Sequence, residues 1–253
     1  MSKFRTSGVR AFSSAQFLTA NALAANALYI VEDRFGSGYP NYHGGEHGGL
    51  AYHNHHHSWV VQKGVERMVD ALGLSATERV IGGMAAAAHD IVQHKPRGVM
   101  ERESADWLAA AMRRSNVFPE SAIKMGVSAI LGTEPIFENN RIVGQIASTQ
   151  EYPSRIAELI GKTVGCADLG ELYASTGPLV AHDFYKEVQG IGQTQTPPMD
   201  KLSDFQLGQV LLAETYRYPH PEGERGFGAL RGPVTDYHMQ VLEQLERGDI
   251  ETW

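Results

Sequence analysis

The hydrophobic positions along the chain recur mainly at the three- or four-residue spacing of an amphipathic α-helix, whereas the strict alternation of a half-buried β-strand is scarce. This pattern predicts an all-α protein. Ser75 followed by Glu78 is the signature of a capping box, so one helix should begin directly after Ser75. The stretches with helical periodicity are residues 14–31, 53–73, 76–92, 102–115, 119–131, 152–175, 178–189, 200–217 and 233–247.

Three segments lack this periodicity and are rich in glycine, proline and polar residues. We expect loops at residues 36–49 and 132–150. At residues 190–198 we expect a linker that leads to a C-terminal helical extension. No internal repeat interrupts the pattern, so residues 1–253 are interpreted as a single domain.

Composition narrows the possible partners and the compartment. The formal net charge of −7 over 253 residues argues against a nucleic-acid partner, because phosphates are met by a basic face. Cys166 is the one cysteine, which excludes an internal disulfide framework and favours a reducing compartment. No apolar run reaches transmembrane length, so we expect no membrane partner and a cytoplasmic location. The segment before Glu32 is basic, as presequences are, but a packed N-terminal helix is favoured over a targeting segment.

Histidine is the unusual residue: the chain has eleven, and six of them lie between His43 and His57. His53 and His57 are four residues apart and would share a helix face with Val61 and Val65. Both imidazoles should therefore point towards the core, where a polar group needs a partner. For either histidine alone, a hydrogen bond inside the core would be the simplest interpretation.

At two further positions, a stripe of apolar residues along a predicted helix ends with a side chain that could bind a metal. His89 and Asp90 follow a run of four alanines, and Asp168 follows apolar residues at helical spacing. A buried, unpaired aspartate would be costly. A cation held jointly by Asp168, His57, His89 and Asp90 would remove that cost.

The order His57, then His89 and Asp90, then Asp168 resembles the H…HD…D pattern of the HD-domain metal-dependent phosphohydrolases. The segment YHNHHHSWVV is also similar to the YHNxxHAxxV signature of the cyclic-nucleotide phosphodiesterases, which share this order of ligands. The full set of positions is more specific than any one of its parts, since an isolated His-Asp dipeptide is common.

This resemblance covers residues from about 50 to about 190, the length of a typical domain. It implies an HD-domain helical bundle as the core, with helical extensions at residues 1–49 and 191–253. The oligomeric state is not predicted.

The resemblance implies a metal site built from His57, His89, Asp90 and Asp168, and a hydrolase that cleaves a phosphate ester of a small nucleotide-like or other phosphorylated metabolite. One or two divalent ions are expected, with Fe, Mn, Zn, Co or Ni at the tight position and Mg or Mn at a looser one. Asp90 would bridge the two ions, metal-activated hydroxide would attack phosphorus, and His53 would protonate the leaving oxygen.

Residues near these positions are candidates for substrate contacts and for support of the ligands. Lys95, Arg97 and His94 follow the His-Asp pair and could neutralise phosphate charge, although a solvated surface loop is an equal interpretation of the two basic residues. Asn54 and His56 flank the ligand His57 and are candidates for its support.

The sequence departs from the known patterns in ways that keep alternatives open. Where several HD nucleotidases carry glutamate, this chain has Gln93, which cannot act as an acid or base. A di-iron HD oxygenase would need additional histidines, but none occurs between Lys95 and Ala181. A non-catalytic nucleotide-binding sensor is the other alternative. His43 and His47 could reach the site or belong to a glycine-rich loop.

Overall fold

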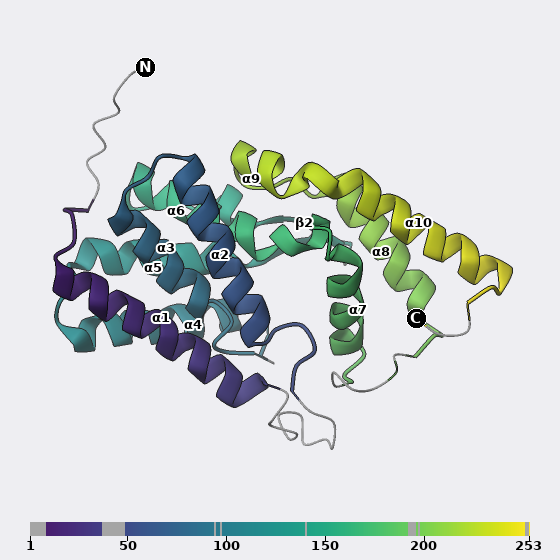
Figure 1. Ribbon diagram of the computed structural model, residues 1–253, viewed down its shortest axis with the longest axis horizontal. Helices are drawn as coiled ribbons and strands as arrows, with labels where there is room; N and C mark the ends of the chain where they lie inside the picture. Colours follow the sequence, from purple (N-terminus) through teal and green to yellow (C-terminus); the bar gives the residue numbers. More distant parts are fainter. Residues whose placement is uncertain are drawn as a thin grey trace.

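The computed structural model describes residues 9–36, 49–93, 95–96, 98–139, 141–191, 196, 198–250 and 253. This described part is all-α apart from one short hairpin, which confirms the predicted fold class (Figure 1). Its helices are α1 (Ser14–Phe35), α2 (His55–Ala71), α3 (Ala76–Ala88), α4 (Val99–Ser115), α5 (Glu120–Leu131), α6 (Arg155–Asp168), α7 (Gly177–Val188), α8 (Leu202–Thr215), α9 (Pro221–Gly226) and α10 (Arg231–Arg247). Short 3₁₀ segments are η1 (Ile146–Ser148), η2 (Gly170–Tyr173) and η3 (Gly228–Leu230).

Helix α3 lies at the centre of the bundle and packs against α1, α2, α5 and α6. Its alanines 85–88 are completely buried. A Cβ atom added at Gly82 would lie 2.9 Å from the Val65 side chain of α2, so the absence of a side chain lets these two helices approach closely. The small residues of α3 therefore bring the ends of α2 and α3 together.

The predicted helices occur where periodicity placed them, but several are shorter than expected. The capping box at Ser75 is present, with Ser75 Oγ accepting a hydrogen bond from the backbone N–H of Glu78. In contrast, α2 begins at His55 rather than 53, α3 ends at Ala88 rather than 92, and α6 ends at Asp168 rather than 175. The candidate metal ligands consequently lie at helix ends rather than inside helices.

Residues 132–150, expected to be a loop, contain an antiparallel hairpin of β1 (Pro135–Glu138) and β2 (Arg141–Gln145). Phe137 pairs with Ile142, and Asn139 adopts a positive φ of 50° beside the turn, a conformation that asparagine tolerates. The apolar alternation covers too few residues to be recognised in the sequence. The short helix α9 was not expected either.

Figure 1 shows α1 packed on the bundle and the pair α8 and α10 beside α7 and the hairpin. Helix α1 packs on α3, which confirms the predicted N-terminal helix. Helix α8 contacts both α10 and strand β2, so the C-terminal extension reaches the hairpin. No described helix combines the length and the hydropathy that crossing a bilayer requires. The expected glycine-rich loop and linker lie partly outside the described residues.

Candidate metal centre

Asn54 sets the start of the helix that carries the first ligand. Its side-chain oxygen accepts hydrogen bonds from the backbone N–H groups of His56 and His57, at 2.8 and 3.3 Å. Its amide nitrogen donates to the carbonyls of Leu50 and Ala51. This N-cap satisfies free helix donors and fixes His57 in the first turn of α2, where its side chain is buried. Asn54 therefore fixes the position of His57 through the helix start, and its support of a metal ligand stays a prediction.

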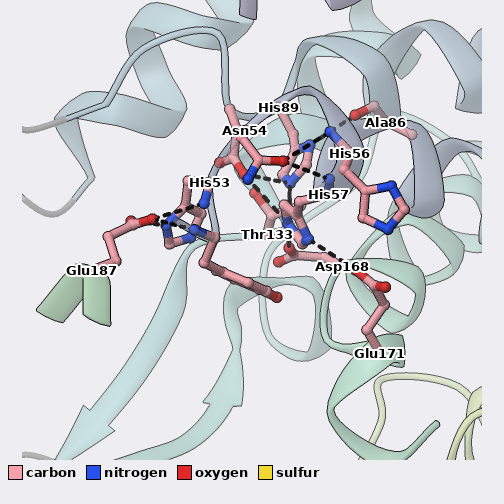
Figure 2. A network of polar contacts seen from close by, with 12 residues as sticks. His53, Asn54, His56, His57, Ala86, His89, Thr133, Asp168, Glu171 and Glu187 are labelled. Atoms are coloured by element: carbon pink, nitrogen blue, oxygen red, sulfur yellow. Dashed lines mark hydrogen bonds and ion pairs between the residues drawn. The ribbon is translucent and has the colours of Figure 1, made fainter. Parts of the chain in front are cut away.

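The second ligand is oriented by the end of α3. The Nδ1 atom of His89 lies 2.7 Å from the carbonyl oxygen of Ala86. Because a carbonyl only accepts hydrogen bonds, Nδ1 must carry a proton, and a metal ion would therefore be held by the lone pair of Nε2. Asp90 follows at once, and Asp168 is the last residue of α6. Three helix ends therefore deliver the expected side chains to one place (Figure 2).

The donor atoms of these residues lie close together. His89 Nε2 is 3.0 Å from Asp90 Oδ2 and 3.3 Å from His57 Nε2. Asp168 Oδ1 is 3.3 Å from Nε2 of both imidazoles, and His57 Nε2 is 3.4 Å from Asp90 Oδ2. Among the described residues, His57, His89 and Asp90 form a group whose ligand atoms all lie within 4.8 Å of one another.

This donor set fits a divalent cation. A metal ion with bonds of about 2.0–2.2 Å to nitrogen and oxygen sets its neighbouring ligand atoms roughly 3.0–3.5 Å apart. The observed separations of 3.0–3.4 Å fall in this interval. In addition, Asp90 Oδ2 is buried and has no hydrogen-bond partner within the described part of the chain. A cation would satisfy this oxygen and would also join two imidazole nitrogens that face each other.

The charges of the group compensate one another. Burial lowers the pKa of His89, but the carboxylates of Asp90 and Asp168 outweigh it and raise that pKa well above its usual range. Conversely, burial raises the pKa of Asp90, yet the imidazoles of His89 and His53 bring it below the ordinary value. The pKa of Asp168 is lowered for the same reason, by His57 and His89. Both carboxyl groups are therefore ionised, as metal ligands must be.

Two polar residues that the sequence did not single out support the ligands. Glu171, in η2, places Oε2 3.5 Å from Nδ1 of His57. Gln145, at the end of β2, donates a hydrogen bond of 3.0 Å to Asp168 Oδ2. Its own oxygen accepts a hydrogen bond of 2.9 Å from Tyr216, which belongs to the C-terminal extension. Outer residues of this kind fix ligand orientation, and their positions became visible only once the hairpin and η2 were located.

His53 reaches the site, although the reason differs from the expected one. It precedes α2 and is held by Glu187 of α7, whose carboxylate contacts His53 Nδ1. Burial opposes protonation of His53, but the charge of Glu187 and then that of Asp90 raise its pKa to about 9. The imidazole is therefore protonated near neutral pH. No periodicity predicted Glu187, which lies far along the chain.

A cavity of about 230 Å³ opens beside these residues. Its wall is mostly apolar and aromatic, with a few amides and carboxylates, and none of the described lining residues is a lysine or arginine. The lining comprises Tyr52, His53, His89, Asp90, Gln93, Met100, Glu101, Thr133, Pro135, Phe137, Ile142, Gln145, Asp168, Leu169, Leu172, Phe184, Gln209 and Leu212. The bundle, the hairpin and the C-terminal extension all contribute, so the site is not confined to the core expected at about 50–190.

Two other predicted site residues that the structure describes, His56 and Lys95, do not line this cavity. His56 is exposed and its ring stacks on Trp59, so the expectation that its side chain supports the ligands is wrong. Lys95 is exposed and forms an ion pair of 2.6 Å with Glu103, away from the cavity wall. The remaining candidates, His43, His47, His94 and Arg97, lie outside the described residues.

Comparisons with known proteins give the class of fold and no family. The sequence matches no protein-family model and no curated protein. Among solved structures, the chain is similar to the crystal structure of Bacillus subtilis YpgQ, with a TM-score of 0.54, 14% identity and coverage of 94% of this chain and 98% of that one. The crystal structure of the same protein in complex with ADP gives a TM-score of 0.54 and 15% identity, covering 94% of this chain and 97% of that one. At this identity the likeness concerns the fold.

Proposed function

We propose that this protein is an HD-type metal-dependent phosphohydrolase that cleaves a phosphate ester of a small nucleotide-like metabolite. The observation that carries the proposal is the meeting of His57, His89, Asp90 and Asp168 around one point, with protonated His53 beside them at a cavity. These residues come from separate helix ends, and their order along the chain is that of the HD-domain phosphohydrolases. A structural core would not need such a donor set.

The nucleotide part of the proposal has separate support. One structural neighbour, YpgQ, was crystallised in complex with ADP, and it covers nearly the whole chain. The cavity is somewhat smaller than the range of about 300–1,000 Å³ common for drug-sized ligands, which suits a small metabolite rather than a polymer.

His57, His89, Asp90 and Asp168 would hold the ion, and Mn, Fe, Zn, Co or Ni suits two imidazoles and two carboxylates. When bound, a divalent cation lowers the pKa of coordinated water and neutralises phosphate charge. Asp90 would also help to hold a second, looser Mg or Mn ion, which belongs to the same proposal.

The protein's own residues supply the proton and the orientation. Glu187 keeps His53 protonated and turns its other ring nitrogen away from the carboxylate, so Nε2 is available to donate a proton to the leaving oxygen. Gln93 lines the cavity but its amide cannot exchange a proton, which supports the proposal that His53 is the acid. Gln145 holds Asp168 in position, and the apolar wall excludes water.

The test is phosphate release from a panel of nucleoside monophosphates, nucleoside diphosphates, sugar phosphates and phosphodiesters. The protein's metals are quantified as purified, and Mn, Co and Mg are then added back separately. We expect metal-dependent release from nucleotide members of the panel and loss of both metal and release in Asp90→Ala. Asp106→Ala, an exposed aspartate on α4, is the matched control and should behave as the unmodified protein.

Absence of release from every compound would contradict the proposed hydrolase. Tightly bound metal without turnover would then favour a nucleotide-binding sensor, and stoichiometric iron would favour an oxygenase.

A further inference from the structure

Glu101 is a buried carboxylate in the cavity that the proposed mechanism leaves unused. It lies in the first turn of α4 and is only 8% exposed. Its Oε2 atom is buried and has no hydrogen-bond partner among the described residues. An acid in the first turn of a helix is favoured by the helix dipole, but that effect operates equally well at the surface. The carboxyl group also accepts hydrogen bonds from the backbone N–H groups of Glu101 and Gly98 at the start of α4, yet neither effect gives Oε2 a partner.

Glu101 is not a ligand of the metal group described above. That group consists of His57, His89 and Asp90, with Asp168 in contact with both imidazoles, and Glu101 is absent from it. Because Glu101 nevertheless lines the same cavity, its free oxygen is available to whatever occupies the space beside the ion. A buried polar atom without a partner is costly unless a ligand satisfies it.

The charge around Glu101 restricts that ligand. Burial raises the pKa of the Glu101 carboxyl group, and the carboxylates of Glu134 and Asp90 raise it further, against the opposite effect of hydrogen bonds from the backbone N–H groups of Glu101 and Gly98. No lysine or arginine is found among the described residues of the cavity wall. A second phosphate or a carboxylate beside Glu101 would meet its charge and those of Glu134 and Asp90, and the protonated His53 on the wall is already paired with Glu187. The group bound here is therefore a neutral or cationic hydrogen-bond donor.

The apolar lining of the cavity favours a hydrogen-bond donor on a flat ring over one on a sugar. Met100, Phe137, Ile142, Phe184 and Leu212 supply aliphatic and aromatic surface to the same cavity. Such walls suit a flat unsaturated ring, which buries apolar faces and keeps its polar groups at the edge. A sugar, which carries hydroxyl groups on all sides, would leave several of them unpaired against these walls.

From these observations we infer that Glu101 is a specificity-determining residue that accepts a hydrogen bond from an amino group on a flat nitrogen heterocycle, the organic part of the substrate. The inference rests on the proposed function, since it names the leaving group whose phosphate lies at the metal. The expected substrates are nucleotides whose base carries an amino group, such as adenine, cytosine or guanine, and whose single phosphate group lies at the ion.

The experiment measures binding rather than turnover, so that it is independent of hydrolysis. Manganese-loaded protein is titrated calorimetrically with three pairs of nucleosides: adenosine and purine riboside, cytidine and zebularine (which has hydrogen in place of the 4-amino group), and guanosine and inosine. Each pair differs by one exocyclic amino group. The variants are Glu101→Gln and Glu101→Asp, and the control is Glu103→Gln on the same helix, which pairs with Lys95 at the surface.

We expect the amino-bearing member of at least one pair to bind about tenfold more tightly or better, the effect of a hydrogen bond to a charged group. In Glu101→Gln this preference should fall to about twofold or less, with manganese content unchanged, because an amide oxygen carries no full charge. Glu101→Asp should also reduce it, since the oxygen is withdrawn by one methylene, and this second variant decides the matter if Glu101→Gln fails to fold. The Glu103→Gln control should retain the full preference.

Three results would overturn the inference. If the unmodified protein binds both members of every pair equally, or binds no nucleoside at all, the inference loses its basis. A preference that survives both changes at Glu101 would assign recognition to another residue. Loss of manganese in Glu101→Gln would show that the carboxylate serves the metal. Each of these leaves the proposed hydrolase to be judged by phosphate release alone.

Discussion

Glu187 holds His53 by its backbone and by its ring at the same time. One carboxylate oxygen accepts hydrogen bonds of 2.8 Å from the backbone N–H groups of Tyr52 and His53, and the other contacts His53 Nδ1. The carboxylate therefore fixes both where the residue lies and which ring nitrogen faces the cavity. It also supplies the charge that keeps the imidazole protonated.

Glu187→Gln should shift the alkaline limb of the activity profile to lower pH. The general acid works while protonated, so activity is present below the pKa of His53, about 9, and is lost as the pH rises through it. Removal of the carboxylate lowers that pKa, and activity should then fail at a lower pH. A bound cation would cancel much of the effect of Asp90 on the pKa of His53. Glu187 would then be the main group that keeps this pKa high. The measurement is kcat/KM against pH.

Glu171→Gln is the matched control for this profile. Glu171 contacts the metal ligand His57 instead of His53, so its change should weaken metal binding without moving the alkaline limb. An alkaline limb that stays in place in Glu187→Gln would remove His53 from the role of general acid.

His53→Ala should retain metal and lose rate. The residue is outside the group of ligand atoms, and loss of a general acid typically costs about 10²–10⁴-fold. The loss should be greatest for esters with poor leaving groups, because these need protonation most. Rates for a series of aryl and alkyl phosphates, with metal content measured in parallel, provide the test. An equal loss across the series would show that His53 is structural.

The residues that meet in the candidate metal centre could be singled out from the sequence because each lies at one end of an apolar stripe with a side chain that needs a partner. His57 begins a stripe of buried positions and His89 and Asp168 end one, and this local rule survives small errors in helix length. His53 lies beside these residues, as expected, but the expected reason, a shared helix face with His57, is wrong. It lies before α2 rather than on its face, and Glu187 holds it there.

The supporting residues could not be predicted because they depend on contacts between distant segments. Gln145 lies on a strand too short to show alternation, and Tyr216 reaches it from the C-terminal extension. Glu187 and Glu101 look like ordinary helix-surface acids in the sequence. Only the packing of α7 and α4 beside the helix ends puts these carboxylates next to His53 and into the cavity.

Gln145→Leu should reduce metal affinity by about 10- to 100-fold, the usual effect of losing a residue that orients a ligand. The change removes the hydrogen bond to Asp168 Oδ2 and keeps the size of the side chain close to the original. Tyr216→Phe is the milder variant, since it only releases the oxygen of Gln145. Competition with a metal chelator measures the affinity. Unchanged affinity in Gln145→Leu would mean that Asp168 is held in place without this hydrogen bond.

The final prediction concerns stability and the pair Gln206 and His238, which joins α8 to α10. The Nδ1 atom of His238 contacts the side-chain oxygen of Gln206, and both side chains are buried. Burial lowers the pKa of His238 to about 4, whereas an unfolded histidine has a pKa of about 6.5. The folded protein therefore keeps this imidazole neutral at a pH where the unfolded chain binds a proton. The stability that the neutral His238 side chain contributes is present above pH 6.5 and is lost as the pH falls towards 4.

From these two pKa values, the free energy of unfolding should fall by about 2 kcal/mol between pH 7 and pH 5 through this group alone. Urea titrations at both pH values measure the difference. His238→Leu should remove this share of the pH dependence, because the buried position no longer binds a proton in either state. The exposed His56→Leu is the control and should leave the dependence intact. If His238→Leu keeps the full acid sensitivity, another buried group controls the docking of α10 on α8.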